Sequence, residues 1–453
     1  MTTPPRRRPY SLWLSILGIA ILGYLTGAAA IYYELPTSGF LERAFLGAKE
    51  WKERKPASGA LAGNASAKPA AGRGVAGDRA FDGYTLYTCA KAVPLGTQAF
   101  LIDMDAKQVH RWMVPFSQVW PKPYHVRGRV ADSRVCFFGC HLDPNGDLLV
   151  VFLGAEQTGC GLAKLDRDSN VLWKYAAPVH HDVDVGDDGT IYALLEEVAD
   201  QWPKELEHLP SPALVDSLVV LSPQGVPLRR PISLVEALRD SPYSELLSTL
   251  VVANATESRP GGQNRPFGPG AQPRELLHAN SVRVLGSGMA PSFPGFQPGQ
   301  VLVSMREIHA LAVLDVELGS VVWAACGPWR SQHDPHFLDD GRLLLFDNHG
   351  LPKRSRVLEY DPRTQALPWS YAGQNGIRFV TNEGGMCQRL PNGNTLVVSS
   401  EDGKILEVTR DHQLAWSTTI PGVVTSARRY ARDQLEFLKE PRSTSQTSGD
   451  TKE

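Results

Sequence analysis

The sequence lacks a charge excess of either sign. It has 46 Lys and Arg against 48 Asp and Glu, which gives a formal net charge of -2. A nucleic-acid-binding surface is strongly basic, so this balance argues against a nucleic-acid partner. An anionic ligand must therefore be met by a local cluster of donors. Because hydrophobic residues make up 42% of the chain, a wholly disordered protein is excluded as well.

Cysteine is scarce, and its spacing is not that of a metal site. The six cysteines include no Cys-X-X-Cys pair, and no histidines stand at a matching distance, which argues against structural zinc. Three of them, Cys136, Cys140 and Cys160, lie close together in the sequence. Disulfides form in oxidising compartments, so in an exported chain we expect this trio to supply a disulfide, with its pairing left open.

Helical periodicity is almost absent beyond the first part of the chain. Instead, 41 glycines and 34 prolines are spread along it without the three-residue period of collagen. These residues mark turns, so their number indicates many short elements joined by turns. The composition favours an all-β protein.

Long apolar runs are missing too, with one exception at residues 11–33, which carry no charge. A helix of this length spans a bilayer core, and three arginines precede it. We therefore expect residues 1–10 to be a cytoplasmic basic tail and the rest of the chain to be exported on a single-pass anchor. The alternative is a cleaved signal peptide, for which the alanines at 28–30 provide a cleavage site. Residues 34–78 are predicted to be a juxtamembrane segment and flexible linker, and residues 439–453 a disordered tail.

Six copies of one pattern occupy most of the remaining chain. Each copy has an apolar run, a turn and a strand that ends in a large residue. The six copies are located, in order, by Leu101, Leu165, Leu221, Leu314, Tyr360 and Val408 in their apolar runs. Tryptophan closes five copies, and Trp323, Trp369 and Trp416 are separated by 46 and 47 residues. This spacing is close to the length of a four-stranded propeller blade.

A second hairpin recurs between the copies, and its turn places glycine beside Asp or Asn. Examples are Asn145-Gly146, Asp188-Gly189, Asp340-Gly341 and Asn392-Gly393. Such dipeptides are strong hairpin signals. We predict an all-β, six-bladed β-propeller over residues 79–438.

Two parts of this propeller are expected to depart from the repeat. The stretch 202–296 contains an irregular insertion that is partly helix-like at 233–250, and this insertion could cover one face of the propeller. The opening strand at Gly83–Leu86 is expected to complete a blade with the carboxy-terminal repeat.

Three histidines occupy a shared phase in the hairpins. His181, His278 and His333 each stand eight residues before a glycine, whereas the equivalent residues of two other hairpins are Phe138 and Gly385. Equivalent positions on different blades surround one axis, so the three imidazoles are expected to converge there. The simpler alternative is that each histidine only satisfies a local hydrogen bond. His180 is expected to point away from His181 and to be peripheral, as are His309, His336 and His349.

Polar residues recur at matched strand ends, seven residues after the turn glycine. They are Glu196, Arg306, Asn348 and Ser400. The planar guanidinium of Arg306 suits a tetrahedral oxyanion, and Asn280 lies on the same strand face as His278. A tri-histidine metal site is the chemical alternative. It is less favoured, because a cation site would use nearby carboxylates rather than admit Arg306.

These residues resemble those of the bacterial arylsulfotransferases that do not use an adenylate-type sulfate donor. The similarity runs from about Gly83 to Leu438. It is carried by Gly-Tyr-Thr-Leu at 83–86, His-His-Asp at 180–182, Leu-His-Ala-Asn-Ser at 277–281, Gln-His-Asp at 332–334, Leu-Phe-Asp-Asn at 345–348 and Gln-Arg-Leu-Pro-Asn-Gly-Asn at 388–394. The chain looks like a shorter, membrane-anchored relative, with its propeller on the periplasmic side of the bacterial inner membrane.

The resemblance implies a six-bladed propeller that transfers a sulfuryl group from a phenolic sulfate ester to a phenol through a sulfated histidine. On the matching motifs, His333 is the nucleophile, while His278, Arg306 and Asn280 hold the sulfuryl oxygens. His181 assists proton transfer, and Asn348 is a further substrate-binding candidate. This scheme needs no metal and no cofactor. The alternative is a non-catalytic envelope propeller that binds a ligand or protein, and the sequence does not indicate an oligomeric state.

Overall fold

The structure is a computed structural model. It describes residues 78–90, 96–126, 130–154, 159–207, 209, 211–250, 273–374 and 377–439, together with the single positions 18, 23 and 26. Apart from those positions, and residues 78 and 439, the predicted basic tail, anchor, linker and carboxy-terminal tail lie outside the described residues. Within the described residues, no helix is long and apolar enough to cross a membrane.

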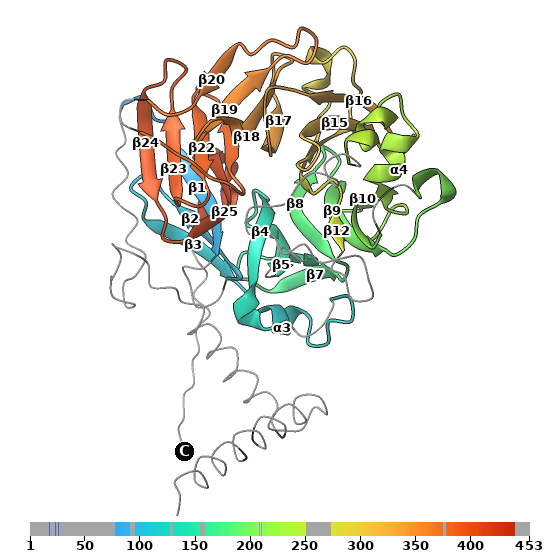
Figure 1. The fold of residues 1–453 in the computed structure, drawn as a ribbon. Helices are drawn as coiled ribbons and strands as arrows, with labels where there is room; N and C mark the ends of the chain where they lie inside the picture. Colours follow the sequence, from blue (N-terminus) through green and yellow to red (C-terminus); the bar gives the residue numbers. More distant parts are fainter. Residues whose placement is uncertain are drawn as a thin grey trace, which may run out of the picture. The chain divides into compact units, whose positions relative to one another are not determined.

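Six antiparallel sheets form the blades of a β-propeller in the described part of the chain. Figure 1 shows them arranged around a common centre, with β8 and β17 close to it and α4 at the rim. The innermost strands are β4 (Val135–Leu142), β8 (Val179–Val185), β13 (Ala279–Val284), β17 (His333–Phe337), β21 (Met386–Arg389) and β25 (Val423–Ala431). The predicted all-β, six-bladed propeller is confirmed.

The second strands of the blades are largely buried. These strands are β1 (Gly83–Ala90), β5 (Leu148–Gly154), β9 (Ile191–Ala199), β14 (Val301–Met305), β18 (Leu343–Leu351) and β22 (Thr395–Ser399). Every residue of β5, β14 and β22 is buried. Each blade has another blade against both of its faces, so these strands are continuous apolar runs rather than alternating ones.

The third and outer strands correspond to the six copies found in the sequence. The third strands are β2 (Gln98–Ile102), β6 (Gly159–Leu165), β10 (Ala213–Leu221), β15 (Ala310–Asp315), β19 (Arg354–Tyr360) and β23 (Lys404–Val408). The outer strands are β3 (Gln108–Met113), β7 (Val171–Tyr175), β11 (Ile232–Ser233), β16 (Ser320–Cys326), β20 (Trp369–Tyr371) and β24 (Leu414–Thr419). A parallel strand, β12 (Arg274–Glu275), adds to β10.

The repeated tryptophans tie four of the outer strands, β3, β7, β20 and β24, to a turn of another blade. The indole Nε1 of Trp112 donates to the carbonyl oxygen of Gly146, and that of Trp369 donates to Arg410. In the same way, Trp416 donates to the carbonyl oxygen of Met104 at 2.8 Å. A buried indole N–H needs such an acceptor, which explains why tryptophan recurs at this place in the repeat.

The propeller closes by combining both ends of the described chain in one sheet. β25 pairs with β1 from Gly83 opposite Ala431 to Ala90 opposite Val423. The sheet order is β25-β1-β2-β3, so the last strand supplies the inner edge of the first blade. The predicted pairing of the opening strand with the carboxy-terminal repeat is confirmed.

The stretch at 202–296 is only partly an insertion. It contributes β10 to the third blade and β13 to the fourth. Between them lie the short helix α4 (Leu234–Arg239), capped by Ser233, and the 3-10 turn η4 (Ser244–Leu247). The apolar side of α4 packs into the core shared by the third and fourth blades.

Within the described residues 78–439, the remaining helical elements are single turns in loops. They are α3 (Phe116–Val119), η1 (Asp132–Arg134), η3 (Lys204–Leu206), η5 (Ala290–Ser292), η6 (Arg432–Gln434) and η7 (Glu436–Leu438). This scarcity of helix agrees with the absence of helical periodicity in the sequence.

All six cysteines are described, and none forms a disulfide. The disulfide expected within the trio at 136–160 is therefore wrong. The sulfur of Cys136 faces the carbonyl oxygen of Leu153, whereas the sulfur of Cys140 faces Ser426 on β25. The two thiols of β4 thus lie against different neighbours, and proximity in the sequence did not bring their sulfur atoms together.

Candidate active site around the propeller axis

The inner strands that carry the histidines are interrupted by β-bulges. Register shifts occur between His180 and Val183 in β8, and between His333 and His336 in β17. His181, His278 and Asp334 have φ values of 53°, 47° and 50°. Positive φ is uncommon in residues other than glycine, and a bulge re-aims the side chains around it. The local backbone therefore turns these side chains out of the regular strand alternation.

Strand register changes the equivalence that was predicted for the fourth blade. The hairpin there closes at Gly299, where the backbone N–H donates to the Leu285 carbonyl, and not at Gly286. His181, His333 and Asn280 each stand four residues before the last inner-strand residue paired across the hairpin. Asn280 is thus the positional equivalent of His333. The shared phase assigned to His278 was wrong, because the glycine used to count it does not make the turn.

His278 nevertheless lies beside His181. Their ring centroids are 4.9 Å apart at an angle of 70°. The ring of Phe138 packs against His181, with the two ring centroids 5.4 Å apart. Burial, followed by the neighbouring His278, His180 and His333, holds the pKa of His181 well below its usual range. The three predicted histidines therefore meet in one buried cluster.

His333 is neutral and is held in one tautomer. Its Nδ1 lies 2.8 Å from Oδ1 of Asn348 and 2.9 Å from the carbonyl oxygen of Ser331. The Asn348 amide nitrogen donates to the carbonyls of Thr381 and Gly384, which fixes the amide oxygen toward the imidazole. Because both neighbours of Nδ1 are acceptors, Nδ1 carries the proton and Nε2 keeps its lone pair.

The pKa of His333 is lowered to about 3, chiefly by burial. The Asn348 contact opposes this effect, while Arg306 and His278 add to it. The nearest donor to Nε2 is the Gly384 N–H, at 3.3 Å. His333 is therefore an unprotonated imidazole whose reactive nitrogen is engaged only by a long hydrogen bond.

Arg306 follows directly after β14, and its guanidinium charge is felt by both His333 and His181, lowering the pKa of each. Nη1 pairs with Oε1 of Glu307 at 2.5 Å, and the backbone N–H donates to the carbonyl of His278. The structure thus brings Arg306 into the histidine cluster, as predicted from the strand ends.

Asn280 is buried next to the strand that carries His333, the candidate nucleophile. Within the described residues, no contact joins it to His278. Its Nδ2 donates to the carbonyl of Gln332, the residue before His333, at 2.8 Å. Gln332 is fully buried, and its own amide nitrogen donates to Ser304, Met305 and Ala310. This network holds the start of β17 firmly against the fourth blade.

His180 is not peripheral, which corrects the expectation drawn from strand alternation. Its Nδ1 lies 2.6 Å from Nδ1 of His181, and its Nε2 lies 3.2 Å from Oδ1 of Asp216 on β10. The positive φ of His181 breaks the alternation that would have placed the two rings on opposite faces. The signal that could have revealed Asp216 is an acidic residue inside an otherwise apolar strand.

The other histidines lie where they were expected, outside the cluster. His309 accepts from the Ser331 N–H, and His336 pairs with Asp334 at 3.0 Å. His349 is exposed and contacts the carbonyl of Asn382. Each of them satisfies a local contact.

A buried network of ion pairs lies beside the histidine cluster. Asp182 and Asp334 each follow a site histidine directly, and Arg283 joins them at 2.6 and 2.5 Å. Arg428 on β25 also pairs with Asp334, at 2.6 Å. Burial disfavours the charged Asp334, but Arg428, His336 and Arg283 outweigh it and hold its pKa well below the usual range. The network links inner strands of four blades and was not predicted from the sequence.

Glu275, His278 and Glu307 form the group within the described residues that could hold a metal ion, since their ligand atoms lie within 4.8 Å of one another. All three residues already have a partner. Oε2 of Glu275 lies 2.6 Å from Nδ1 of His278, and Glu307 pairs with Arg306. The nearby guanidinium disfavours a second cation, but the donor set itself suits one.

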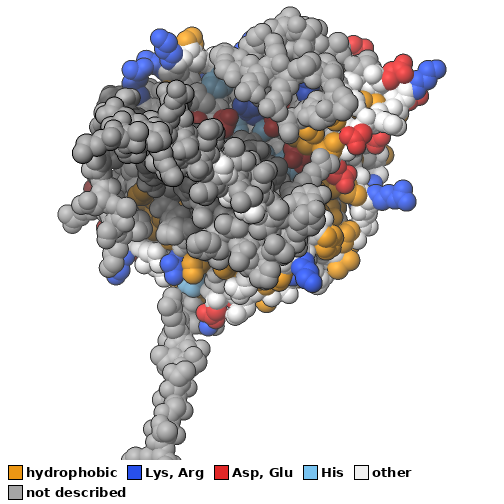
Figure 2. Space-filling view, turned by 60° about the horizontal axis from the view of Figure 1, so that its bottom comes forward, with side chains coloured by type: hydrophobic (Ala, Val, Ile, Leu, Met, Phe, Trp, Pro, Cys, Tyr) orange, Lys and Arg blue, Asp and Glu red, His pale blue; other side chains and the backbone are white. Residues whose placement is uncertain are grey.

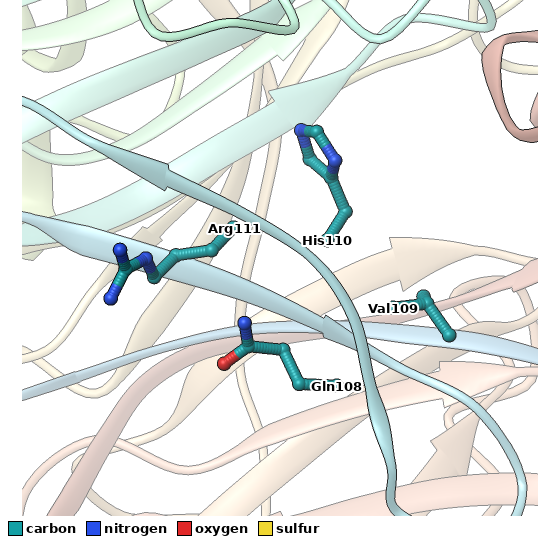
Figure 3. A pocket seen from close by; sticks show the side chains of 4 residues that line it. All are labelled: Gln108, Val109, His110 and Arg111. Carbon is teal, nitrogen blue, oxygen red and sulfur yellow. The ribbon is translucent and has the colours of Figure 1, made fainter. Parts of the chain in front are cut away.

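A separate hollow of about 530 Å³ lies on the outer strand β3. Figure 3 shows Gln108, Val109, His110 and Arg111 around it. His110 bonds the carbonyl of Arg167 and packs edge-on against Trp112 at 4.4 Å, so its ring is part of the blade packing.

Figure 2 shows acidic, basic and histidine side chains together in a recess of the surface.

Three solved structures match the chain at low sequence identity. A Bacteroides caccae protein of unknown function matches with a TM-score of 0.48 at 11% identity, over 77% of this chain and 98% of its own. Virginiamycin B lyase from Staphylococcus aureus matches with a TM-score of 0.35 at 8% identity, over 63% and 70%. The WD40 propeller domain of Doa1 matches with a TM-score of 0.39 at 11% identity, over 76% and 81%. No curated protein matches the chain.

A family model identifies the chain more specifically. The model of the arylsulfotransferase (ASST) family matches residues 141–420, which is more than half of the sequence. This range includes all three clustered histidines, Arg306 and Asn348. The chain belongs to the arylsulfotransferase family.

Proposed function

We propose that the protein transfers a sulfuryl group from an aryl sulfate ester to a phenolic acceptor through a sulfated His333. The observation that carries this proposal is the state of His333, which is neutral, presents the Nε2 lone pair and lies within the field of Arg306. Nucleophilic catalysis by histidine requires an unprotonated nitrogen. Family membership supports the same reaction.

In the first half-reaction, the Nε2 lone pair forms a bond to sulfur while the bond between sulfur and the phenolic oxygen breaks. The electron pair leaves on that oxygen, which then takes up a proton. Sulfation makes the imidazole ring cationic, and the Asn348 oxygen stabilises the remaining Nδ1–H. In the second half-reaction, the acceptor oxygen loses its proton to a base and attacks sulfur, and the bond to Nε2 breaks with its electron pair returning to the imidazole.

The negative charge on the sulfuryl oxygens needs preorganised donors. Arg306 supplies a guanidinium, and His278 supplies a second ring, whose Nδ1 is held by Glu275 at 2.6 Å. Asn280 donates one amide hydrogen to Gln332 and retains another. Asn348 uses its oxygen and both hydrogens inside the protein, so we assign it to positioning His333 rather than to binding substrate.

Intact-mass analysis after incubation with 4-nitrophenyl sulfate tests the proposal. We expect a mass increase of one sulfuryl group, which peptide mapping places on His333 and which phenol removes. His333→Ala should form no adduct and should release no 4-nitrophenol. His141→Gln is the matched control, because this histidine belongs to a half-exposed surface pair with Asp143. An adduct on another residue, or none across a broad donor panel, would refute the proposed role.

A second candidate is a cation-dependent activity, which the Glu275, His278 and Glu307 group favours. Sulfuryl transfer by His333 predicts full activity after treatment with EDTA. Loss of activity with EDTA and its recovery with a single divalent metal would favour the cation-dependent function instead.

We also propose that residues 11–33 anchor the protein in the membrane, with the propeller exported. The uncharged apolar run and the arginines before it support this location. Alkaline extraction of membranes should leave the full chain in the pellet. Release of a shortened chain into the soluble fraction would indicate a cleaved signal peptide.

A further inference from the structure

His180 and His181 share a hydrogen bond that requires a defined distribution of protons. Their Nδ1 atoms are 2.6 Å apart, and both side chains are buried. Two lone pairs at this distance repel, and two N–H groups clash, so one ring donates and the other accepts. The pair therefore holds one proton between its two Nδ1 atoms.

Asp216 identifies His180 as the donor. Its carboxylate lies 3.2 Å from Nε2 of His180, and their side chains are only 5% and 1% exposed. The contact is an ion pair without hydrogen-bond geometry, so the carboxylate acts on His180 through its charge and favours the protonated ring. In the imidazolium both nitrogens of His180 carry hydrogen, and the Nδ1 proton points to His181.

The third blade explains why a cation is needed at this place. Asp216 on β10 stands directly opposite Glu196 on β9 in the strand register. Like charges directly opposite each other destabilise a sheet, and burial makes their repulsion stronger. A protonated His180, which pairs with Asp216, compensates this negative charge.

The surroundings of the two rings also favour a charged His180 and a neutral His181. Burial disfavours a charged His180, but Asp216, Glu196 and Glu275 outweigh it and raise its pKa. His181 instead faces His278, His333 and Arg306, and its pKa is held well below the usual range by burial and these neighbours. His181 is thus neutral, accepts at Nδ1 and carries its own hydrogen on Nε2.

We propose that Asp216, His180 and His181 form a buried proton relay that protonates the leaving phenolic oxygen and later deprotonates the acceptor phenol. The inference rests on the proposed sulfuryl transfer at His333. It assigns roles to Asp216 and His180, neither of which reaches the substrate directly, so both are positioning residues that act through His181.

The relay balances over the two half-reactions. As the bond between sulfur and the phenolic oxygen breaks, the His181 Nε2–H proton moves to that oxygen, and the His180 Nδ1–H proton moves to Nδ1 of His181. His180 is then neutral. When the acceptor attacks, its O–H proton moves to Nε2 of His181, and the Nδ1–H proton returns to His180. No proton is gained or lost over a full turnover.

The relay also resolves a difficulty of the site. A single histidine placed as His181 is cannot store a proton at neutral pH, because its cationic neighbours disfavour the imidazolium. His180 stores the charge one ring further away, next to carboxylates. His181 then donates from a neutral ring and is recharged in the same step.

A comparison of leaving groups tests the relay in the full-length protein. Phenyl sulfate releases a basic phenolate that needs a proton, whereas 4-nitrophenyl sulfate releases a stable anion that needs much less help. We expect His180→Gln to lower turnover of phenyl sulfate by about 10²-fold, and to lower it at least about tenfold more than turnover of 4-nitrophenyl sulfate. His141→Gln should keep the wild-type ratio of phenyl sulfate turnover to 4-nitrophenyl sulfate turnover. Equal losses with both donors, or no loss, would overturn the relay.

Asp216→Asn provides a second variant that keeps the shape of the side chain but removes its charge. Above the pKa of His180, the imidazolium and hence the proton supply are lost, so turnover of phenyl sulfate should fall on the basic side of the pH profile. Without the carboxylate, this basic limb should move to lower pH by about 1–3 units. An unmoved limb would contradict the assignment of the proton to His180.

The charge states can also be measured without catalysis. Nitrogen NMR of the full chain labelled at its 12 histidines should show one buried ring protonated on both nitrogens and its partner neutral with hydrogen on Nε2. Two neutral rings would overturn the relay even if sulfuryl transfer is found. The expected signals in a protein that transfers no sulfuryl group would instead refute the proposed function and leave the proton distribution standing.

Discussion

The amide oxygen of Asn348 lies 2.8 Å from Nδ1 of His333 and thereby selects the imidazole tautomer. The amide cannot rotate to offer its nitrogen, because Nδ2 already donates to two carbonyl groups. The reactive nitrogen is consequently Nε2. A side chain on β18 thus decides which atom of a β17 histidine can act as the nucleophile.

Replacing Asn348 by Ala should lower kcat for 4-nitrophenyl sulfate by about 10²-fold, because the imidazole loses one of the two acceptors that fix its tautomer and position. KM should change little, since Asn348 does not contact the substrate in this scheme. Steady-state kinetics measure both constants. Asn170→Ala, which removes an exposed turn amide bonded to Asp166, serves as the control. A rise in KM at constant kcat would show direct substrate binding by Asn348.

The neutral state of His333 makes folding stability depend on pH. Its pKa is about 3 in the folded protein, against about 6.5 for an unperturbed histidine. As the pH falls below 6.5, the unfolded chain therefore takes up a proton that the folded chain refuses, and stability decreases. His333→Gln should reduce the loss of unfolding free energy between about pH 7 and about pH 4.5 by about 2 kcal/mol.

Urea unfolding at the two pH values measures this effect. His141→Gln should keep the wild-type difference. His180 acts in the opposite direction, because its raised pKa contributes stability at low pH that is lost as the pH rises through that pKa. A His333→Gln variant with the wild-type pH dependence would show that His333 titrates normally.

Arg283 should be critical for stability because it connects two buried carboxylates. Its side chain is 11% exposed, and it pairs with both Asp182 and Asp334. Arg283→Met leaves Asp182 buried without its cation, which should cost about 3–5 kcal/mol in unfolding free energy. Arg363→Met removes an exposed partner of Asp361 and should cost about 1 kcal/mol or less. Equal losses in chemical denaturation would contradict this role of the network.

The cysteines should all be reduced thiols in the folded protein. Alkylation of the denatured but unreduced chain should modify all six, as mass spectrometry can count. Thermal unfolding should then be the same with and without dithiothreitol. Modification of only four thiols would show that two cysteines form a disulfide, as the clustered sequence positions suggested.

The sequence alone predicted the fold because the propeller repeats itself. Each blade needs a buried second strand, a tight hairpin turn and a large residue on the outer strand, and these demands recur along the chain. Tryptophans such as Trp369 and Trp416 mark blades because each donates to a turn of another blade. Local signals and the global fold thus agree at every copy.

The sequence determined which residue types form the site: the three histidines, Arg306 and the two asparagines. Only the tertiary structure decided how they are arranged. Counting from glycines misplaced His278, because the fourth hairpin closes at Gly299. Strand alternation likewise dismissed His180, because a bulge at His181 is not visible in the residue order.

The partners of these side chains come from distant parts of the chain. Asp216 reaches His180 across the third blade, and Arg428 reaches Asp334 from the last strand. Such contacts depend on strand register and on the closure of the ring, which bring residues together across any separation in sequence. The protonation states that suit His333 to the proposed role of nucleophile arise from burial and neighbouring charges, so they exist only in the folded propeller.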